Sequence, residues 1–447
     1  MILGVNPFNI NEPIMDMSKE ALKKQVLKTI DEKAVKIKKI GDDLWKIPEV
    51  GYREYKTAEY VEAQYEQMGW HYQDKLALTG SKAYIKPKKH TPTIAIVGEL
   101  DSLDIPTHPE ADPKTGWVHA CGHHAQVTAM LGAGFGLDAV KEELDGNVAL
   151  LAVPAEELIQ MGFRNSLREE KKITFMGGKQ EFIHIGAMND IDLTIGSHSS
   201  GSLKGARLGT GGTENGFIAK LVQYKGMEAH AGDHPDEGIN ALNAAMLGVM
   251  GAHANRETFR DEDHIRFHPI ITKGGEIVNN VPAEVNMESF VRGATVESIK
   301  NANKKVNNAL RAGAMAVGAS VEIIDVPGYM PYHRDPWLDA VLRENCLQLE
   351  ERVPIGGHSC GSTDLGDFSC IHPTTSLEMG GITGNHHHRT YKIVDKETLY
   401  VLPAKALALT VIDLLYDGAS KAKEIKEKFN PVIPRDEYTK FMERLVE

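Results

Sequence analysis

Several runs of consecutive apolar residues along the chain have the length of one buried strand. Residues 93–98 and 147–153 lack the alternation of apolar and polar positions that a half-exposed strand shows. Such runs are typical of strands covered on both faces of a sheet. Residues 191–196 and 374–377 show the same pattern. The chain therefore predicts a central sheet with both faces buried.

Segments with helical spacing of apolar residues lie between these strands. Residues 19–45 are predicted to form one charged amphipathic helix, and residues 57–68 a second that ends at Gly69. A third runs from residue 123 to about 140, and a final helix covers residues 402–416. Strands that alternate with helices predict an α/β fold, with a mostly parallel central sheet flanked by helices.

From about Thr213 the order of elements changes. Strand, helix, strand, strand, helix and strand are expected in turn at residues 217–224, 238–254, 265–272, 283–292, 299–317 and 320–326. This is the order of a ferredoxin-like α+β unit. At 447 residues the chain also exceeds what one hydrophobic core usually holds. We therefore expect residues 1–213 and 327–447 to form one domain, into which residues 214–326 are inserted.

Charge and cysteine content narrow the class of protein. The formal net charge of −12 argues against nucleic acid or an anionic membrane as partner, because both require a basic surface. Four scattered cysteines are too few for a disulfide framework, which suggests a reducing compartment. Residues 1–19 lack the features of a signal peptide, and no apolar stretch is long enough to predict a membrane span. We expect a cytoplasmic protein.

Ionisable residues, three carboxylates and one imidazole, follow the predicted strands. Asp101 follows residues 93–98, the pair Glu156 and Glu157 follows residues 147–153, and His198 follows residues 191–196. In such sheets ligands bind beyond the carboxyl ends of the strands. These four side chains are therefore expected to share one site.

The segment His119-Ala120-Cys121-Gly122-His123-His124 carries the most distinctive chemistry. Thiolate, imidazole and carboxylate are the ligands of zinc-like divalent ions. Cys121 and His123 can project together only from a turn or a helix start, where Gly122 supplies backbone freedom and a helix N-terminus favours thiolate. The alternative is a buried structural cysteine beside surface histidines.

The remaining candidates also have ordinary structural explanations. One of the two glutamates could bind metal while the other takes a proton from metal-bound water, or both could be merely solvated. His198 could be a satisfied polar residue, and His386-His387-His388 a chance run.

Taken together, the ordered motifs resemble the aminoacylase and carboxypeptidase family of dinuclear metallopeptidases. The likeness is to its amidohydrolase branch, which contains hydrolases of N-acyl-amino acids, hippurate, auxin conjugates and aminobenzoyl-glutamate. It extends from about residue 35 to 415. The motifs are IPEVGYRE (47–54), GELD (98–101), HACGH (119–123), PAEE (154–157), GSH (196–198), AHAGDHPDEGINAL (229–242), NNVPA (279–283) and the late histidines with Tyr391.

The resemblance implies two divalent metal ions per subunit, which could be zinc, manganese, cobalt or nickel. Glu156 matches the general base, and Asp101 matches a carboxylate that orients a ligand histidine. Spacing to Tyr391 favours His387 over its two neighbours as the last ligand. The implied metal ligands are Cys121 (bridging), His123, Glu157, His198 and His387.

The resemblance also assigns roles within residues 214–326, as a lid and dimerisation domain of a homodimer. His230 would reach across the dimer to stabilise the oxyanion. Asn279 and Arg292 would hold the substrate's carboxylate. A loop histidine and a surface arginine are the structural alternatives for His230 and Arg292.

Two departures from the branch leave the substrate open. His124 stands where most relatives have Asp, and Glu99-Leu100-Asp101-Ser102-Leu103 replaces the commoner Arg-x-Asp-Met-Asp. The segment at residues 361–367 is similar to that of aminobenzoyl-glutamate hydrolases and dipeptidases.

We predict a metal-dependent amidohydrolase that cleaves N-acyl-amino acids or small peptide-like substrates through a metal-activated water. A dipeptidase or aminobenzoyl-glutamate-type hydrolase is the alternative. A catalytically silent binding protein, or a hydrolase of another bond such as an ester, is a further one; the Pro-Cys-x-x-Cys pair of deaminases is missing from the sequence.

Overall fold

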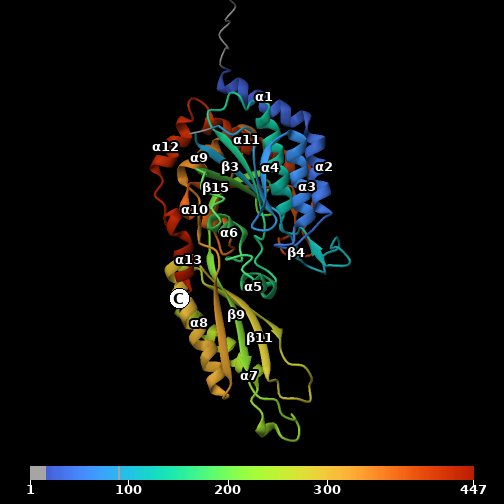
Figure 1. Cartoon of the computed structure of the whole chain (residues 1–447), viewed down its shortest axis with the longest axis vertical. Helices are drawn as coiled ribbons and strands as arrows, with labels where there is room; N and C mark the ends of the chain where they lie inside the picture. Colours follow the sequence, from blue (N-terminus) through green and yellow to red (C-terminus); the bar gives the residue numbers. More distant parts are fainter. Residues whose placement is uncertain (1–16, 89–90, 447) are drawn as a thin grey trace, which may run out of the picture.

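The computed structural model describes residues 17–88 and 91–446 (Figure 1). Most of the N-terminal segment considered above for a signal peptide lies outside these residues. The chain forms an upper body around a large sheet and an elongated lower body around a smaller one.

The large sheet has the strand order β1-β2-β6-β3-β7-β15-β8-β13, and β14 also pairs with β8. Its centre, β6-β3-β7-β15, is parallel throughout. The mostly parallel α/β sheet predicted from the sequence is therefore confirmed. The strands are β1 (His71–Leu76), β2 (Gly80–Tyr84), β3 (Thr93–Glu99), β6 (Asn147–Val153), β7 (Leu193–Ser199), β8 (Leu208–Glu214), β13 (Tyr332–His333), β14 (Ile355–Ser359) and β15 (Thr374–Met379).

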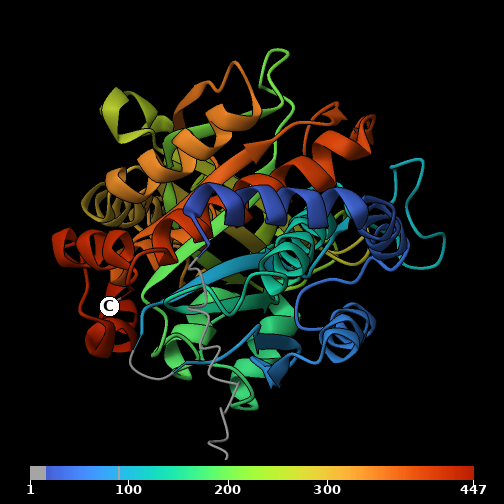
Figure 2. The same ribbon diagram turned by 90° about the horizontal axis from the view of Figure 1, so that it is seen from above.

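Both faces of this sheet are covered, which explains the unbroken apolar runs. In β3, Ile94 and Ile96 enter one hydrophobic core, whereas Ala95 and Val97 enter the other. Figure 2 shows α1 and α11 crossing the top of the first core. That core receives α1 (Lys19–Glu32), α2 (Ala34–Trp45), α3 (Tyr55–Met68), α4 (His123–Asp138), α9 (Pro336–Leu349), α11 (Leu402–Leu415) and α12 (Ser420–Lys428); the second receives α5 (Met161–Glu169), α6 (Gly178–His184), α10 (Leu365–Ile371) and α13 (Tyr438–Leu445).

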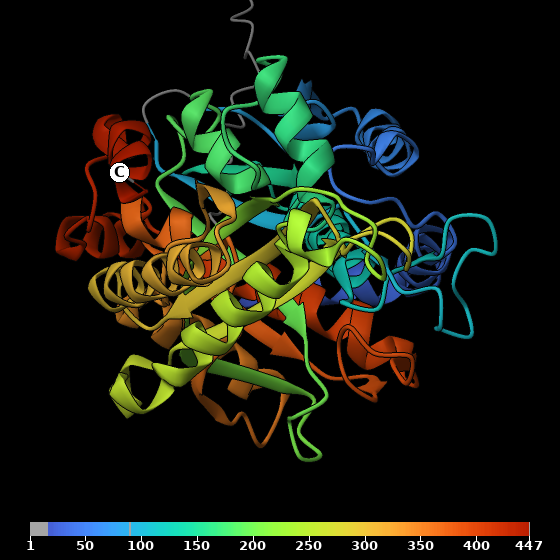
Figure 3. The ribbon, with the colours of Figure 1, turned by 90° about the horizontal axis from the view of Figure 1, so that it is seen from below.

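The smaller sheet has the order β10-β11-β9-β12 and is antiparallel throughout. With its two helices it has the strand and helix order of a ferredoxin-like unit. The helices lie side by side against the sheet (Figure 3). We call this unit the insertion domain, and the rest of the chain the main domain. Its elements are β9 (Gly216–Lys225), α7 (Ala241–Ala254), β10 (Arg266–Lys273), β11 (Glu284–Gly293), α8 (Val296–Ala316) and β12 (Ser320–Pro327).

Short elements complete the connections between these units. The strand pairs are β4 (Leu103–Asp104) with β5 (Trp117–Val118), and β16 (Ile382–Thr383) with β17 (Lys392–Ile393); the single turns are 3-10 helices at Pro235–Glu237, Arg256–Thr258, Asp261–Asp263 and Arg435–Glu437, and a π-helical turn at Glu397–Val401.

Three predictions about single elements were wrong. Residues 19–45 form two helices, because the backbone of Lys33 leaves the helical conformation and its N–H bonds back to Asp31 and Thr29. β7 extends to Ser199, so His198 lies within the strand and not after it. Two more helices, α12 and α13, follow the helix that the sequence suggested as the last.

One helical stretch, Glu397–Leu415, is long and apolar enough to cross a membrane. Within the structure 89% of its apolar window is buried, as expected of a helix in the core. The expected lack of a membrane-spanning segment stays a prediction.

Candidate metal centre

A large open cleft, with a volume of about 1450 Å³, lies between the main domain and the insertion domain. Its walls include Glu99 at the end of β3, side chains that follow β6, side chains of β7, and Arg292 from β11. The carboxyl ends of the parallel strands therefore open into this cleft, where the sequence predicted a site.

The N-terminus of α4 places Cys121 and His123 together. Gly122 caps the helix with φ = 94°, a left-handed conformation that favours glycine. A Cβ atom here would also collide with the side chain of Ser199. The helix start predicted at residue 123 is confirmed, and both side chains reach into the site from it.

The side chains predicted as ligands converge in two overlapping groups. Cys121, His123 and His198 each offer one donor atom, and the three atoms lie within 4.8 Å of one another; so do those of Cys121, Glu157 and His387. Cys121 Sγ lies 3.4 Å from His198 Nε2, and Glu157 Oε1 lies 2.9 Å from His387 Nε2. Cys121 belongs to both groups, the place that a bridging ligand would occupy.

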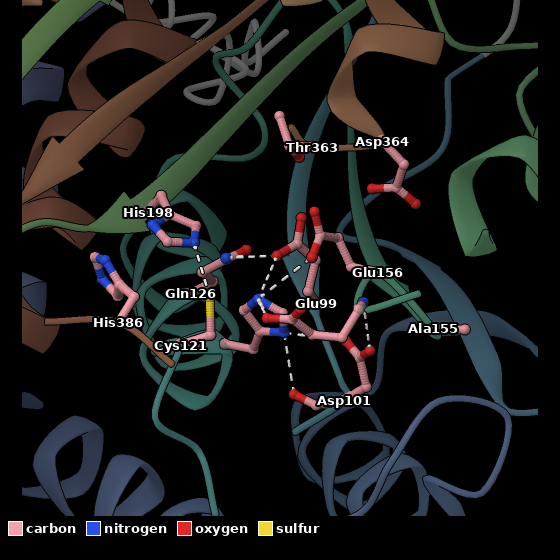
Figure 4. A network of polar contacts seen from close by, with 12 residues as sticks. Glu99, Asp101, Cys121, Gln126, Ala155, Glu156, His198, Thr363, Asp364 and His386 are labelled. Carbon is pink, nitrogen blue, oxygen red and sulfur yellow. Dashed lines mark hydrogen bonds and ion pairs between the residues drawn. The ribbon is translucent and has the colours of Figure 1, made fainter. Parts of the chain in front are cut away.

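Asp101 holds two of these ligands, His123 and Glu157, in place at once (Figure 4). One carboxylate oxygen and the main-chain oxygen of Asp101 each lie 3.0 Å from His123 Nδ1, while the other carboxylate oxygen accepts from the Glu157 N–H at 2.7 Å. Because both partners of Nδ1 are acceptors, Nδ1 carries a proton. Nε2 of a neutral His123 therefore presents its lone pair to the site.

The late histidines take three different positions. His387 contacts Glu157, as described above, and its backbone has φ = 55°, held by a hydrogen bond from its N–H to the carbonyl oxygen of Ala120. His386 instead pairs its Nε2 with the Ser199 hydroxyl at 3.0 Å, and His388 pairs with Thr390.

The donor set fits a pair of divalent ions. His123 Nε2 and Glu157 Oε1 are buried, and within the described residues their close contacts, Glu99 at 3.1 Å and His387 at 2.9 Å, lack hydrogen-bond geometry. Buried polar atoms are normally satisfied, so donor atoms without a hydrogen bond beside a thiol and further imidazoles suit metal ligation. Cys, His and Glu donors accept zinc and its neighbours in the first transition row.

Comparison with known proteins then identifies the family. The model of peptidase family M20/M25/M40 matches residues 95–410, most of the chain. The chain belongs to peptidase family M20/M25/M40. A mouse protein named Xaa-Arg dipeptidase is 27% identical over 425 residues, 90% of each chain. IAA-amino acid hydrolase ILR1-like 4 of Arabidopsis thaliana is 26% identical over 287 residues, 62% of this chain and 61% of that one.

Solved structures support the same fold. A putative aminohydrolase from methicillin resistant Staphylococcus aureus superposes with a TM-score of 0.70 at 21% identity, over 88% of this chain and all of that one. The aminobenzoyl-glutamate utilization protein from Klebsiella pneumoniae gives 0.67 at 17% identity, over 88% and 99%. The predicted resemblance, the fold and the reaction class, a metal-dependent hydrolase of amide bonds, are confirmed.

Electrostatics in this M20/M25/M40 site favour a thiolate among imidazoles. Burial and the Glu157 carboxylate oppose ionisation of Cys121, but the surrounding histidines, His123 foremost, lower its pKa to about 6. Burial opposes protonation of His198, but the Cys121 thiolate raises its pKa to about 10. Divalent ions that replace the imidazole protons would be stabilised by the same Cys121 thiolate.

Glu156 stands apart from the ligand groups electrostatically. Burial, followed by the charges of Glu99 and Glu157, raises the pKa of Glu156 well above its ordinary value. Its carboxylate lies 3.8 Å from His123 Nε2, and its main-chain oxygen accepts a hydrogen bond from the Tyr329 hydroxyl. A carboxyl group with this affinity for protons, beside the ligands, can exchange a proton with a bound water.

A buried charge network behind the ligands was not predicted. Glu99 accepts from Lys179 at 2.6 Å and from Gln126 at 2.6 Å, and its carboxylate lies 3.1 Å from His123 Nε2. Lys179 also pairs with Asp364, and all three charged side chains are buried. Glu99 and Asp364 lie in segments that the sequence singled out, but Lys179, on α6, gave no signal.

The predicted substrate residues are not all in the cleft. Arg292 lines it, stacked on Phe217 and Phe290. His230 and Asn279 lie on the exposed surface of the insertion domain, apart from the cleft walls in the described part of the chain. One chain therefore brings Arg292 to the metal ligands but not His230 or Asn279.

His124, the departure noted in the sequence, points away from the ligands. It is buried beside Trp45, and its Nε2 lies 3.2 Å from the Tyr400 hydroxyl. The presence of His in place of Asp at this position therefore alters the packing under α4 and does not change the cleft wall.

Proposed function

We propose that the protein hydrolyses small dipeptides with a free carboxylate, using two divalent ions held by Cys121, His123, Glu157, His198 and His387. The observation that carries this proposal is the convergence of these five donors in one cleft, with Glu156 beside them. The relatives that match 90% or more of the chain are named Xaa-Arg dipeptidase, whereas the plant hydrolases match about 60%. This favours a dipeptide over the conjugates named for the plant relatives, and an N-acyl-amino acid is the second candidate.

When bound, the two ions would lower the pKa of a shared water and polarise the scissile carbonyl. Asp101 would keep His123 in the tautomer whose Nε2 faces the ions, and would hold the backbone before Glu157. Zinc, manganese, cobalt and nickel all accept this donor set.

Glu156 would act as general base and then as general acid. Its raised proton affinity allows it to take a proton from the attacking water and to deliver that proton to the departing amine. The Tyr329 hydroxyl fixes its main chain, so the carboxylate stays beside the ligands.

Arg292 would bind the substrate carboxylate. It is half-buried in the cleft, and its Nε donates to His268 Nε2 at 3.1 Å. Burial lowers the pKa of Arg292, and the carboxylates of Glu157 and Glu156 oppose that effect. A guanidinium fixed in this way can bind a carboxylate in a bidentate manner.

The insertion domain would serve as lid and dimerisation domain of a homodimer. Its exposed apolar side chains include Met250 on α7 and Ile270 on β10, and Val278, beside Asn279, is 93% exposed. These exposed apolar side chains support the proposal of an interface on this unit. A second copy there would cover them and present His230 to the cleft of its neighbour, where Asn279 would also act.

A small-molecule substrate, with no role for nucleic acid or membrane, agrees with the acidic net charge. A cytoplasmic location, proposed from the cysteine content, would keep the Cys121 thiol reduced.

The test is amine release from a matched panel: Xaa-Arg and other dipeptides, N-acetyl- and indoleacetyl-amino acids, and aminobenzoyl-glutamate. Metal-stripped protein is assayed alone and with each metal restored. We expect dipeptide cleavage that depends on metal. Preference for N-acyl-amino acids would select the second candidate, and turnover by the metal-free protein would contradict both.

A further inference from the structure

A second group of metal-binding side chains lies apart from the predicted ligands. His264, His358 and Cys360 each offer one donor atom, and these atoms lie within 4.8 Å of one another. The two imidazole rings stack with centroids 4.1 Å apart and an interplanar angle of 24°. None of the three has a part in the chemistry described above.

The group joins the two domains. His264 precedes β10 of the insertion domain, whereas His358 belongs to β14 of the main domain and Cys360 follows that strand. All three side chains are half-buried, and His358 and Cys360 form part of the cleft wall. An ion held by all three would therefore tie one domain to the other.

Asn215, at the link between β8 and β9, prepares the two histidines. Its side-chain N–H donates to the carbonyl oxygen of His264 at 2.9 Å, which leaves its amide oxygen 3.1 Å from His358 Nε2. An oxygen acceptor at Nε2 requires a proton there, so Nδ1 keeps the free lone pair of the neutral ring. Nδ1 now pairs only with the Thr213 hydroxyl at 2.9 Å, a partner that can turn away.

The backbone of His264 is held in an uncommon conformation. Its φ is 50°, in the left-handed region that residues other than glycine rarely adopt. The hydrogen bond from Asn215 holds its carbonyl in place. The backbone of His264 is therefore held where its imidazole stacks on that of His358.

We propose that His264, His358 and Cys360 form a third, separate metal site that binds zinc and clamps the insertion domain onto the main domain. Two imidazoles and one thiol, without a carboxylate, suit zinc better than manganese or magnesium. Three protein ligands leave the fourth position to water. Because the site lies beside the β8–β9 link, occupancy would restrain movement between the domains and slow turnover at high zinc.

The thiol of Cys360 provides a direct measurement. Cys121, Cys346 and Cys370 are buried, and Cys360 is partly exposed. We would follow the alkylation of Cys360 by mass spectrometry of its peptide, in protein first loaded with two equivalents of manganese and then titrated with zinc. We expect alkylation to slow about tenfold when free zinc reaches ten times the dissociation constant of the site.

The variant that decides the domain-spanning geometry is His264→Ala, which removes only the donor from the insertion domain. Zinc should no longer protect Cys360 in that variant. His268→Ala, which removes a different cleft histidine of the same domain, is the matched control and should keep the protection. Equal protection in His264→Ala and wild type, or none in wild type, would overturn the proposal.

Metal counting gives an independent check that does not depend on thiol chemistry. Wild-type protein should bind one more zinc ion than Cys360→Ser, whatever the occupancy of the other centre. An unchanged count in Cys360→Ser would contradict the third site, even if alkylation had suggested it.

Discussion

The main domain completes its share of the site within one chain, whereas the insertion domain does not. Asp101, His123 and Glu157 are buried and joined by hydrogen bonds of 2.7–3.0 Å. His230 is exposed, and its Nδ1 accepts from the N–H groups of Gly232 and Asp233 in its own loop. The groups proposed for metal ligation and proton transfer are therefore placed by the fold of one chain, whereas the proposed role of His230 would need another copy or a domain movement.

The largest effect should come from a change in the part of the site that the main domain completes within one chain. Glu156→Gln removes the proton carrier but keeps the shape of the side chain, so we expect kcat to fall about 10²- to 10⁴-fold. Metal content, measured by elemental analysis, should stay at the wild-type value. Glu214→Gln, which changes another glutamate of the cleft wall, is the control. A Glu156→Gln protein with wild-type kcat would remove Glu156 from the mechanism.

Loss of one exposed residue of the insertion domain should lower kcat nearly as much. His230→Ala removes an oxyanion donor, for which we expect a loss of about 10²- to 10³-fold in kcat with metal content unchanged. His234→Ala, in the same exposed loop, should have little effect.

Mixed dimers test whether His230 acts across the interface. A dimer of one Glu156→Gln chain and one His230→Ala chain contains one site with both wild-type residues, if His230 comes from the neighbour. Random mixing should then restore about a quarter of wild-type activity. If His230 served its own chain, the mixture would stay inactive, since every site would lack one of the two groups.

Two buried lysines, one in each domain, allow the main domain and the insertion domain to be compared through the free energy of unfolding. Lys179 pairs with Glu99 and Asp364 behind the metal ligands, and Lys220 pairs with Asp325 on the insertion sheet. Substitution of either by Met leaves carboxylates without their charge partner, which we expect to cost up to about 3–5 kcal/mol in urea unfolding. Only Lys179→Met should also weaken metal binding, because Glu99 contacts His123. Equal metal affinity in both variants would separate this network from the centre.

The sequence predicted most of the fold because the parallel sheet is buried on both faces. Continuous apolar runs marked β3 and β6, and the residues after them formed the site. The break at Lys33 could not be predicted, because both halves of residues 19–45 keep helical spacing and only tertiary packing decides where the chain turns.

Within the site, a different cause limited which residues could be predicted from the sequence. Ligands that follow strand ends carry a positional signal, whereas Lys179 is joined to Glu99 and Asp364 across 80 and 185 residues. The cluster of His264 with His358 and Cys360 likewise depends on how the two domains meet. Contacts between distant segments leave no periodic pattern in a single sequence.

The smallest effect we predict concerns Asp367, on α10 beneath the site. Burial raises its pKa to about 8, although the Tyr438 hydroxyl donates to it at 2.5 Å. Its unfolded pKa is about 3.9, so the folded state binds a proton that the unfolded state releases between these values, and stability falls as the pH rises through that window.

The substitution Asp367→Asn removes this dependence of stability on pH. Its gain over wild type in urea unfolding should be about 1–3 kcal/mol larger at about pH 9 than at about pH 6. Glu443→Gln, an exposed change on the helix that carries Tyr438, should shift stability equally at both pH values. A gain of Asp367→Asn that does not grow with pH would mean that this carboxyl group is already ionised in the folded main domain.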